Sequence, residues 1–105
     1  MESDAADLYE AVAQAVEHDP PSDRDRGFGA DALKVNRKIF AMLVDGNLVL
    51  KLPRSRVEAL VATGEGSPFD PGHGRVMREW VTVSPTASAQ WIPLAEEARA
   101  FVASR

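Results

Sequence analysis

The dipeptide Asp45-Gly46 separates two apolar runs and constrains this chain more than any other feature. Both residues tolerate the positive φ of a type I′ turn, so the dipeptide predicts a two-residue β-hairpin. The turn fixes the register of the two strands. Three apolar pairs then face one another on one side of the hairpin: Leu43 with Leu48, Ala41 with Leu50, and Ile39 with Leu52. We expect these six side chains to form a buried face.

The same register defines the opposite face of the hairpin. Alternation places Phe40 there between Lys34 and Lys51, a weak cation–π arrangement. Three more apolar side chains lie close by on that face: Met42, Val44 and Val49. Water is a poor neighbour for so much apolar surface, so we expect either a helix of the same chain or a partner to cover it.

A second turn, around Asn36, precedes this hairpin, and its length is open to two interpretations. A two-residue loop over Asn36-Arg37 would place Lys34 beside Ile39 on the core face. A three-residue loop over residues 36–38 pairs Val35 with Ile39 and Leu33 with Ala41. Because burial of an unpaired ammonium costs free energy, we expect the longer loop.

Helical periodicity predicts three helices around these strands. Their apolar residues recur over residues 5–16, 57–61 and 94–102, and a strand with alternating residues is expected over 75–83. Residues 64–74 contain glycine and proline and are interpreted as irregular. We expect Phe28, Trp91 and Phe101 to anchor the core. The fold class predicted for residues 1–105 is one α+β domain, an antiparallel sheet of a three-stranded meander plus a later strand, with flanking helices.

Charge is distributed unevenly along the chain. Residues 1–33 contain nine acidic and two basic residues, whereas residues 34–56 contain six basic residues against Asp45 alone. This pattern can mark a surface for nucleic acid or an acidic partner, but more often an acidic segment simply folds over a basic one. The sequence pI of 5.1 argues against a dedicated nucleic-acid binder.

Composition excludes several classes of site. The chain has no cysteine, which removes disulfides, thiolate zinc sites and cysteine nucleophiles. Its longest apolar run, residues 39–44, is too short to cross a bilayer, and the N-terminus has no signal-peptide pattern. We therefore expect a cytoplasmic protein that makes no membrane contact.

Six motifs and a helix, in this order, resemble the TfoX N-terminal domain-like family, which is related in fold to the MmcQ/YjbR proteins. The motifs are Phe28-Gly29, Leu33-Lys34-Val35-Asn36, Lys38-Ile39-Phe40-Ala41, Leu48-Val49-Leu50-Lys51-Leu52-Pro53, Pro68-Phe69-Asp70-Pro71-Gly72 and Glu79-Trp80-Val81, followed by the helix over residues 94–102. The resemblance implies a stand-alone α+β domain with no established enzymatic activity. Two positions depart from the family pattern: Arg37 replaces the usual glycine of the first turn, and Gly27 precedes the aromatic-glycine loop.

Catalysis has little support in the sequence. The only histidines are His18 and His73, and His73 lies near Asp70 and Glu79 without a recognised metal-ligand spacing. The glycine-rich loop lacks the Gly-Lys-Ser/Thr ending of a phosphate-binding loop. Asp70-Pro71-Gly72 is typical of a tight turn. We expect no catalytic residue, cofactor or metal, and treat a small enzyme or ligand site around Asp70 and His73 as the weakest alternative.

The function expected is that of a non-enzymatic regulatory or adaptor domain that binds another protein or a second copy of itself. Its candidate interaction surface is the outer hairpin face: Lys34, Phe40, Met42, Val49 and Lys51. A nucleic-acid-associated regulator that uses the basic segment 34–56 is the alternative.

Overall fold

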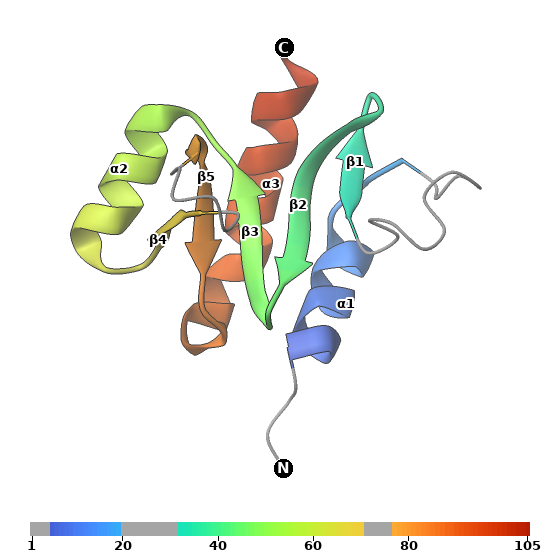
Figure 1. Ribbon diagram of the computed structural model, residues 1–105. Helices are drawn as coiled ribbons and strands as arrows, with labels where there is room; N and C mark the ends of the chain where they lie inside the picture. Colours follow the sequence, from blue (N-terminus) through green and yellow to red (C-terminus); the bar gives the residue numbers. More distant parts are fainter. Residues whose placement is uncertain (1–4, 20–31, 71–76) are drawn as a thin grey trace.

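One antiparallel sheet of five strands, in the order β1-β2-β3-β5-β4, forms the framework of the protein (Figure 1). The computed structural model describes residues 5–19, 32–70 and 77–105. The predictions for Phe28 and His73 lie outside these ranges. The strands are β1 (Leu33–Val35), β2 (Lys38–Val44), β3 (Asn47–Lys51), β4 (Ser67–Phe69) and β5 (Met77–Val83).

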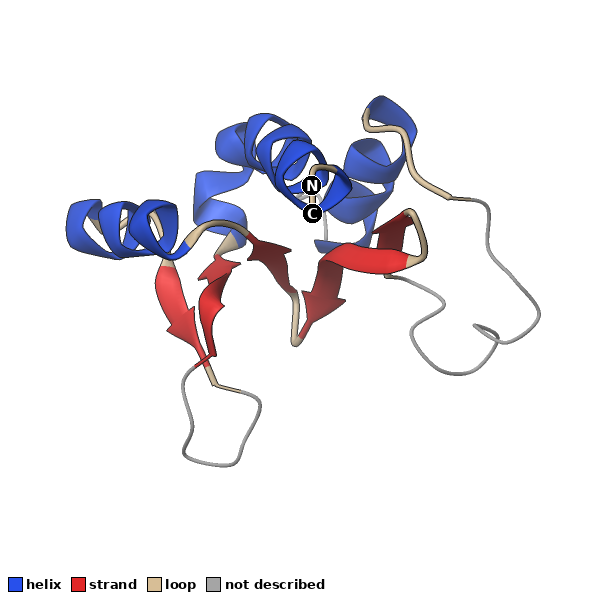
Figure 2. Cartoon of the chain, turned by 90° about the horizontal axis from the view of Figure 1, so that it is seen from above, coloured by secondary structure: helices blue, strands red, loops and turns tan. Residues whose placement is uncertain are grey.

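The described helices all lie on one face of this sheet (Figure 2). They are α1 (Ala5–Ala15), α2 (Arg54–Thr63), the 3-10 helix η2 (Pro85–Gln90) and α3 (Trp91–Ala103). Helices that gather on one side of an antiparallel sheet define an α+β fold, so the predicted class is confirmed. An ion pair joins α2 to α3: Arg56 Nε lies 3.0 Å from Glu97 Oε1, and this contact raises the pKa of Arg56.

The hydrophobic core fills the space between the helices and the inner face of the sheet. The fully buried sheet residues of this core are Phe40, Ala41, Leu48, Leu50, Leu52, Val81 and Val83. The helices contribute Tyr9, Val12, Leu60, Trp91, Leu94, Ala98 and Val102. Trp91 satisfies its indole N–H by donating to the Ser84 carbonyl at 3.1 Å. Burial of this set is the main stabilising contribution to the fold.

The Asp45-Gly46 turn forms as predicted. Both residues have positive φ, +52° and +80°, as a type I′ turn requires. The pairs Leu43–Leu48 and Ala41–Leu50 are present. Ile39 and Leu52 do not pair as expected. The Leu52 N–H instead donates to the Glu79 carbonyl of β5 at 3.0 Å.

The first turn is shorter than predicted. Asn36 and Arg37 have φ of +52° and +67°, and they form a two-residue turn that pairs Val35 with Lys38 and Lys34 with Ile39. The three-residue loop is therefore wrong, although the expected pair of Leu33 with Ala41 is present. We expected the two-residue loop to bury the Lys34 ammonium. An irregularity in β2 keeps Lys34 out of the core.

A β-bulge at Phe40 reverses the predicted orientation of the start of β2. One step along β1, from Leu33 to Lys34, corresponds to two steps along β2, from Ala41 to Ile39. The extra residue is Phe40, and it shifts the alternation of side chains by one position. Phe40 and Ala41 are both completely buried in the core. The prediction that Phe40 lies on the outer face is therefore wrong.

Ile39 takes the place predicted for Phe40. It pairs with Lys34, is only partly buried, and does not pack against the core cluster. The bulge thus keeps Lys34 off the core side, and the predicted six-residue buried face loses Ile39. Leu43 remains partly buried against the core.

Several further expectations changed in detail. Strand β4 lies within the segment interpreted as irregular, and Met77 is 41% exposed although its strand neighbours Val81 and Val83 are buried. Helix α3 begins at Trp91, directly after η2, and so starts before residues 94–102. Trp91 is buried as expected, whereas Phe101 is only partly buried. Gly64 ends α2 in the left-handed conformation that glycine favours.

We predict that Phe40→Ala lowers the free energy of unfolding by about 3–5 kcal/mol, since a fully buried ring is lost from the core. Met42→Ala is the matched control, because Met42 lies two residues away on the other face and is partly exposed. Its loss should be below about 1.5 kcal/mol. Urea denaturation measures both. Equal losses in the two variants would contradict the assignment of Phe40 to the core.

We predict that Arg37→Gly stabilises the fold by roughly 1 kcal/mol, because a non-glycine residue at φ of +67° is strained by contact of its Cβ with the backbone. The midpoint of thermal unfolding should rise. A fall in the midpoint would show that the Arg37 side chain contributes more to folding than its backbone conformation costs.

Candidate binding site on the outer face of the sheet

The face of the sheet that points away from the helices carries a second set of apolar side chains, and we call it the outer face. Its members are Ile39, Met42, Val44, Val49, Phe69 and Trp80. None of them belongs to the core cluster or packs against it. Within residues 5–19, 32–70 and 77–105, no helix lies on this face (Figure 2). The expectation that a helix of the chain covers it therefore finds no support in the described ranges.

The predicted surface residues differ in how far a partner can reach them. Met42 and Val44 are partly exposed, so they are available for contact. Val49 is only 1% exposed, although it lies between Met42 and Thr82 on the outer face. Val49 is therefore not accessible to a partner in this structure.

A pocket of about 560 Å³ lies at one end of the sheet, where β2 and β3 separate. Five cationic residues line it: Lys34, Arg37, Lys38, Lys51 and Arg105. Three apolar residues complete the lining: Ile39, Trp80 and Val102. The structure thus brings together Lys34 and Lys51, the two lysines of the predicted surface, and adds three cations to them. We call this the basic pocket.

The divergence of β2 and β3 creates the basic pocket. Their registered pairing extends to Ala41 and Leu50, and beyond it Leu52 bonds to β5 instead. Figure 1 shows the two strands separating at this end of the sheet, with α3 behind the opening, on the helix side of the sheet. Strands β3 and β5 stay paired, and Trp80 lies directly opposite Lys51. The pocket therefore combines residues from β1, β2, β3, β5 and α3.

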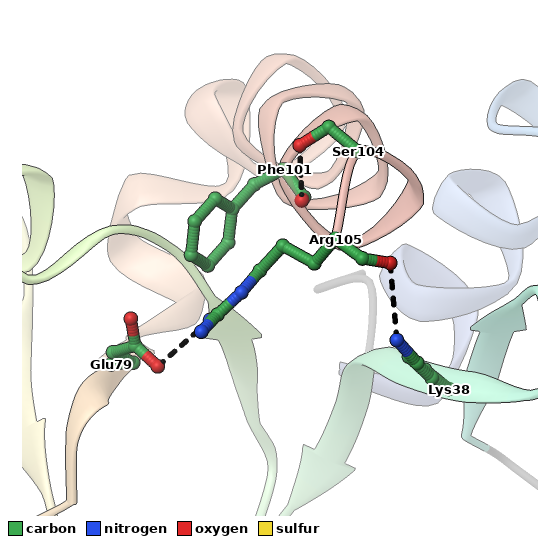
Figure 3. A network of polar contacts seen from close by, with 5 residues as sticks. All are labelled: Lys38, Glu79, Phe101, Ser104 and Arg105. Atoms are coloured by element: carbon green, nitrogen blue, oxygen red, sulfur yellow. Dashed lines mark hydrogen bonds and ion pairs between the residues drawn. The ribbon is translucent and has the colours of Figure 1, made fainter.

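Arg105 contacts both β2 and β5 at the end of the sheet where β2 and β3 separate (Figure 3). Its Nη1 lies 3.0 Å from Glu79 Oε1 on β5, and its backbone oxygen accepts a 3.1 Å hydrogen bond from Lys38 Nζ on β2. Its guanidinium also lies 5.0 Å from the centroid of the Phe101 ring. Arg105, two residues after the end of α3, thus links β2 to β5 at the end of the sheet where β3 no longer pairs with β2.

Trp80 forms the aromatic wall of the basic pocket. Lys51 Nζ lies 5.6 Å from the centroid of its ring, a cation–π contact. The Phe69 ring, from β4, lies 6.5 Å from the Trp80 ring at an angle of 54°. Such tilted aromatic pairs attract one another. These contacts hold Trp80 in place while it remains partly exposed.

The electrostatic balance of the basic pocket is positive. Five cationic side chains line it, and no carboxylate side chain of residues 5–19, 32–70 or 77–105 belongs to the lining. The nearest carboxylates with a described contact are Glu79, paired with Arg105, and Asp19, whose Oδ2 accepts the Arg37 backbone N–H at 2.7 Å. Like charges that converge in a partly enclosed site raise the local concentration of anions. The arrangement is therefore chemically suited to hold an anionic group.

The remaining candidates from the sequence do not come together as a site. His18 contacts two backbone oxygens, those of Ala13 at 3.1 Å and Asp19 at 3.0 Å. Glu79 is paired with Arg105. Among the described residues, there is no group of three histidine or carboxylate side chains placed to hold a metal ion. None of the described helices is long and apolar enough to cross a membrane.

Sequence reasoning missed most of the basic pocket. The predicted hairpin register places Ile39 in the core, and the predicted interaction surface does not include Arg37, Lys38 or Arg105. The position of Trp80 opposite Lys51 depends on the pairing of β3 with β5, which local sequence does not reveal. The cluster of cations around the first turn was the one available signal.

Comparisons of the chain with protein-family models, with curated proteins and with solved structures gave no match. The resemblance to the TfoX N-terminal domain-like family thus stays a prediction.

Proposed function

We propose that this chain is a non-enzymatic protein-binding domain that receives an acidic segment of a partner protein on its outer face. The observation that carries the proposal is the basic pocket, in which five cations and Trp80 lie at the end of an apolar sheet face. The acidic side chains of the partner would enter the pocket, and its apolar side chains would lie on Met42 and Val44.

Charge complementarity supports a partner of this kind. Charged groups across an interface steer association and exclude wrong partners more than they add raw affinity. The apolar residues of the outer face supply the contact area that charge alone does not. Together they favour a segment that alternates acidic and apolar residues, since such a segment matches both parts of the surface.

The distribution of the cations argues against nucleic acid. Arg54 and Arg56, which belong to the same basic stretch of sequence, lie on α2 and pair with Glu58 and Glu97. The other four basic residues of that stretch converge on one pocket, so the described basic residues do not form a ribbon along which a phosphate backbone could run. The pI of 5.1 points the same way.

A non-enzymatic role agrees with the chemistry of the pocket. General acid–base catalysis needs a titratable group within reach of a reacting atom. Glu79, the carboxylate beside the pocket, is paired with Arg105, and the described part of the pocket lining contains no histidine, serine or cysteine. The assignment to the TfoX N-terminal-like family and a cytoplasmic location belong to the same proposal, and the order of the elements and the lack of cysteine support them.

The test uses a short synthetic peptide of Glu, Asp, Leu and Ser residues, titrated into the full chain with NMR detection of the backbone amides and the tryptophan indoles. We expect shifts at the basic pocket and the outer face, including the Trp80 indole, and an affinity that falls as salt is added. Lys51→Glu should weaken binding roughly tenfold, because it reverses one charge in the pocket.

Arg54→Glu is the matched control. It makes the same change of charge on α2, outside the basic pocket, and a carboxylate is favourable in the first turn of a helix. Equal weakening by the two variants would contradict the proposal. A dimeric mass of the free chain by light scattering, with outer-face amide shifts that depend on protein concentration, would also contradict it, because a second copy would then be the occupant.

A further inference from the structure

The ion pair between Arg105 and Glu79 engages one of the cations that line the basic pocket. Arg105 Nη1 lies 3.0 Å from Glu79 Oε1 (Figure 3). Glu79 itself does not belong to the lining of the pocket, whereas Arg105 does. The carboxylate therefore acts on the pocket from outside, through the guanidinium that it holds.

Glu79 lies on the helix side of the sheet, whereas a partner reaches the outer face. The Leu52 N–H donates to the Glu79 carbonyl, so Glu79 lies opposite Leu52, which is fully buried in the core on the helix side. The next residue of β5, Trp80, lies opposite Lys51 and belongs to the outer face. Because side chains alternate between the two faces of a strand, Glu79 draws the Arg105 guanidinium to the side opposite the outer face.

Other contacts of Arg105 hold its backbone at the pocket independently of Glu79. Its backbone N–H donates to the Val102 carbonyl at 3.2 Å, and its backbone oxygen accepts the 3.1 Å hydrogen bond from Lys38 Nζ. The guanidinium also lies 5.0 Å from the centroid of the Phe101 ring. None of these contacts needs the carboxylate, so the guanidinium can leave Glu79 while the Arg105 backbone stays in place.

The pair is weak enough to be exchanged for another. The side chains of Arg105 and Glu79 are 49% and 38% exposed, and ion pairs exposed to this degree add little to the stability of a fold. Because Glu79 belongs to the same chain, it competes for the guanidinium at a fixed, high local concentration. A carboxylate from solution therefore displaces it only with the help of further contacts.

We infer that Glu79 is an internal competitor of the acidic segment for Arg105. In the free protein Glu79 holds the guanidinium, and on binding an acidic side chain of the segment takes its place. This inference rests on the proposed function and adds a means of regulation to that site. Glu79 excludes lone carboxylates and reserves Arg105 for a segment whose apolar side chains also contact the outer face.

Isothermal titration of the peptide of Glu, Asp, Leu and Ser residues into the full chain tests the inference, at about 0.15 M salt, where distant charges are screened. Glu79→Gln should tighten binding roughly two- to fivefold, the range that corresponds to an exposed ion pair that no longer has to be broken. In the Arg105→Gln background, the same change of Glu79 should leave the affinity unchanged, because Glu79 acts only through Arg105.

Glu58→Gln is the matched control. Glu58 forms an exposed ion pair with Arg54 on α2, and neither residue lines the basic pocket. The change removes the same charge and an ion pair of the same kind as Glu79→Gln does. It should therefore leave the affinity for the peptide unchanged.

The NMR signal of the Arg105 Nε–H group reports the exchange in the wild-type chain without any variant. It should shift when the peptide binds, because the guanidinium changes its carboxylate partner. Acetate at the same concentration of carboxylate should leave the signal in place, since it makes no contact with the outer face.

The outcomes distinguish the inference from the proposal beneath it. Equal tightening by Glu79→Gln and Glu58→Gln, no tightening by Glu79→Gln, or tightening that persists in the Arg105→Gln background would each overturn the inference. An Arg105 signal that the peptide leaves in place, or that acetate shifts equally far, would do the same. All of these results leave the protein-binding function intact, whereas failure of the peptide to bind the wild-type chain and every variant would overturn both.

Discussion

The extra residue at Phe40 in β2 is the constraint on which the rest of the structure depends. It changes the phase of side-chain alternation within a single strand. The C-terminal part of β2 follows the register that the Asp45-Gly46 turn imposes, whereas the N-terminal part follows the Asn36-Arg37 turn. The two turns demand opposite orientations of the strand. The bulge satisfies both, since it places Phe40 and Ala41 together in the core.

The same bulge prepares the candidate site. Because Phe40 turns inward, Ile39 and Lys34 come to the outer face beside Lys51 and Trp80. Beyond Leu50, strand β3 follows β5 and no longer β2, so the sheet opens, and Arg105, two residues after the end of α3, contacts both β2 and β5 there.

The sequence predicts the parts of this fold that local chemistry determines. The Asp45-Gly46 turn, the pairs of β2 with β3, the stop of α2 at Gly64 and the apolar stripe of α3 all follow from nearby residues. The bulge could not be predicted, because it reconciles two turns that are each locally acceptable. A backbone irregularity, and not a longer loop, keeps Lys34 out of the core.

The candidate site was predictable only in part, for a related reason. Lys34 and Lys51 were identified because they flank the hairpin, yet the ring between them was taken to be Phe40, where the structure places Ile39. Trp80 reaches Lys51 only through the pairing of β3 with β5, and Arg105 only through the packing of α3. Contacts between elements far apart in sequence leave no signature in local spacing.

The central claim is that the bulge directs Phe40 inward and Ile39 outward. A nuclear Overhauser experiment on the isotope-labelled chain measures this most directly, since it reports which protons lie close together. The account predicts contacts from the Phe40 ring to core methyl groups of α1 and α3, and from the Ile39 methyl groups to side chains of the basic pocket. Contacts of the Phe40 ring with Trp80 or Val49, together with core contacts from Ile39, would contradict it.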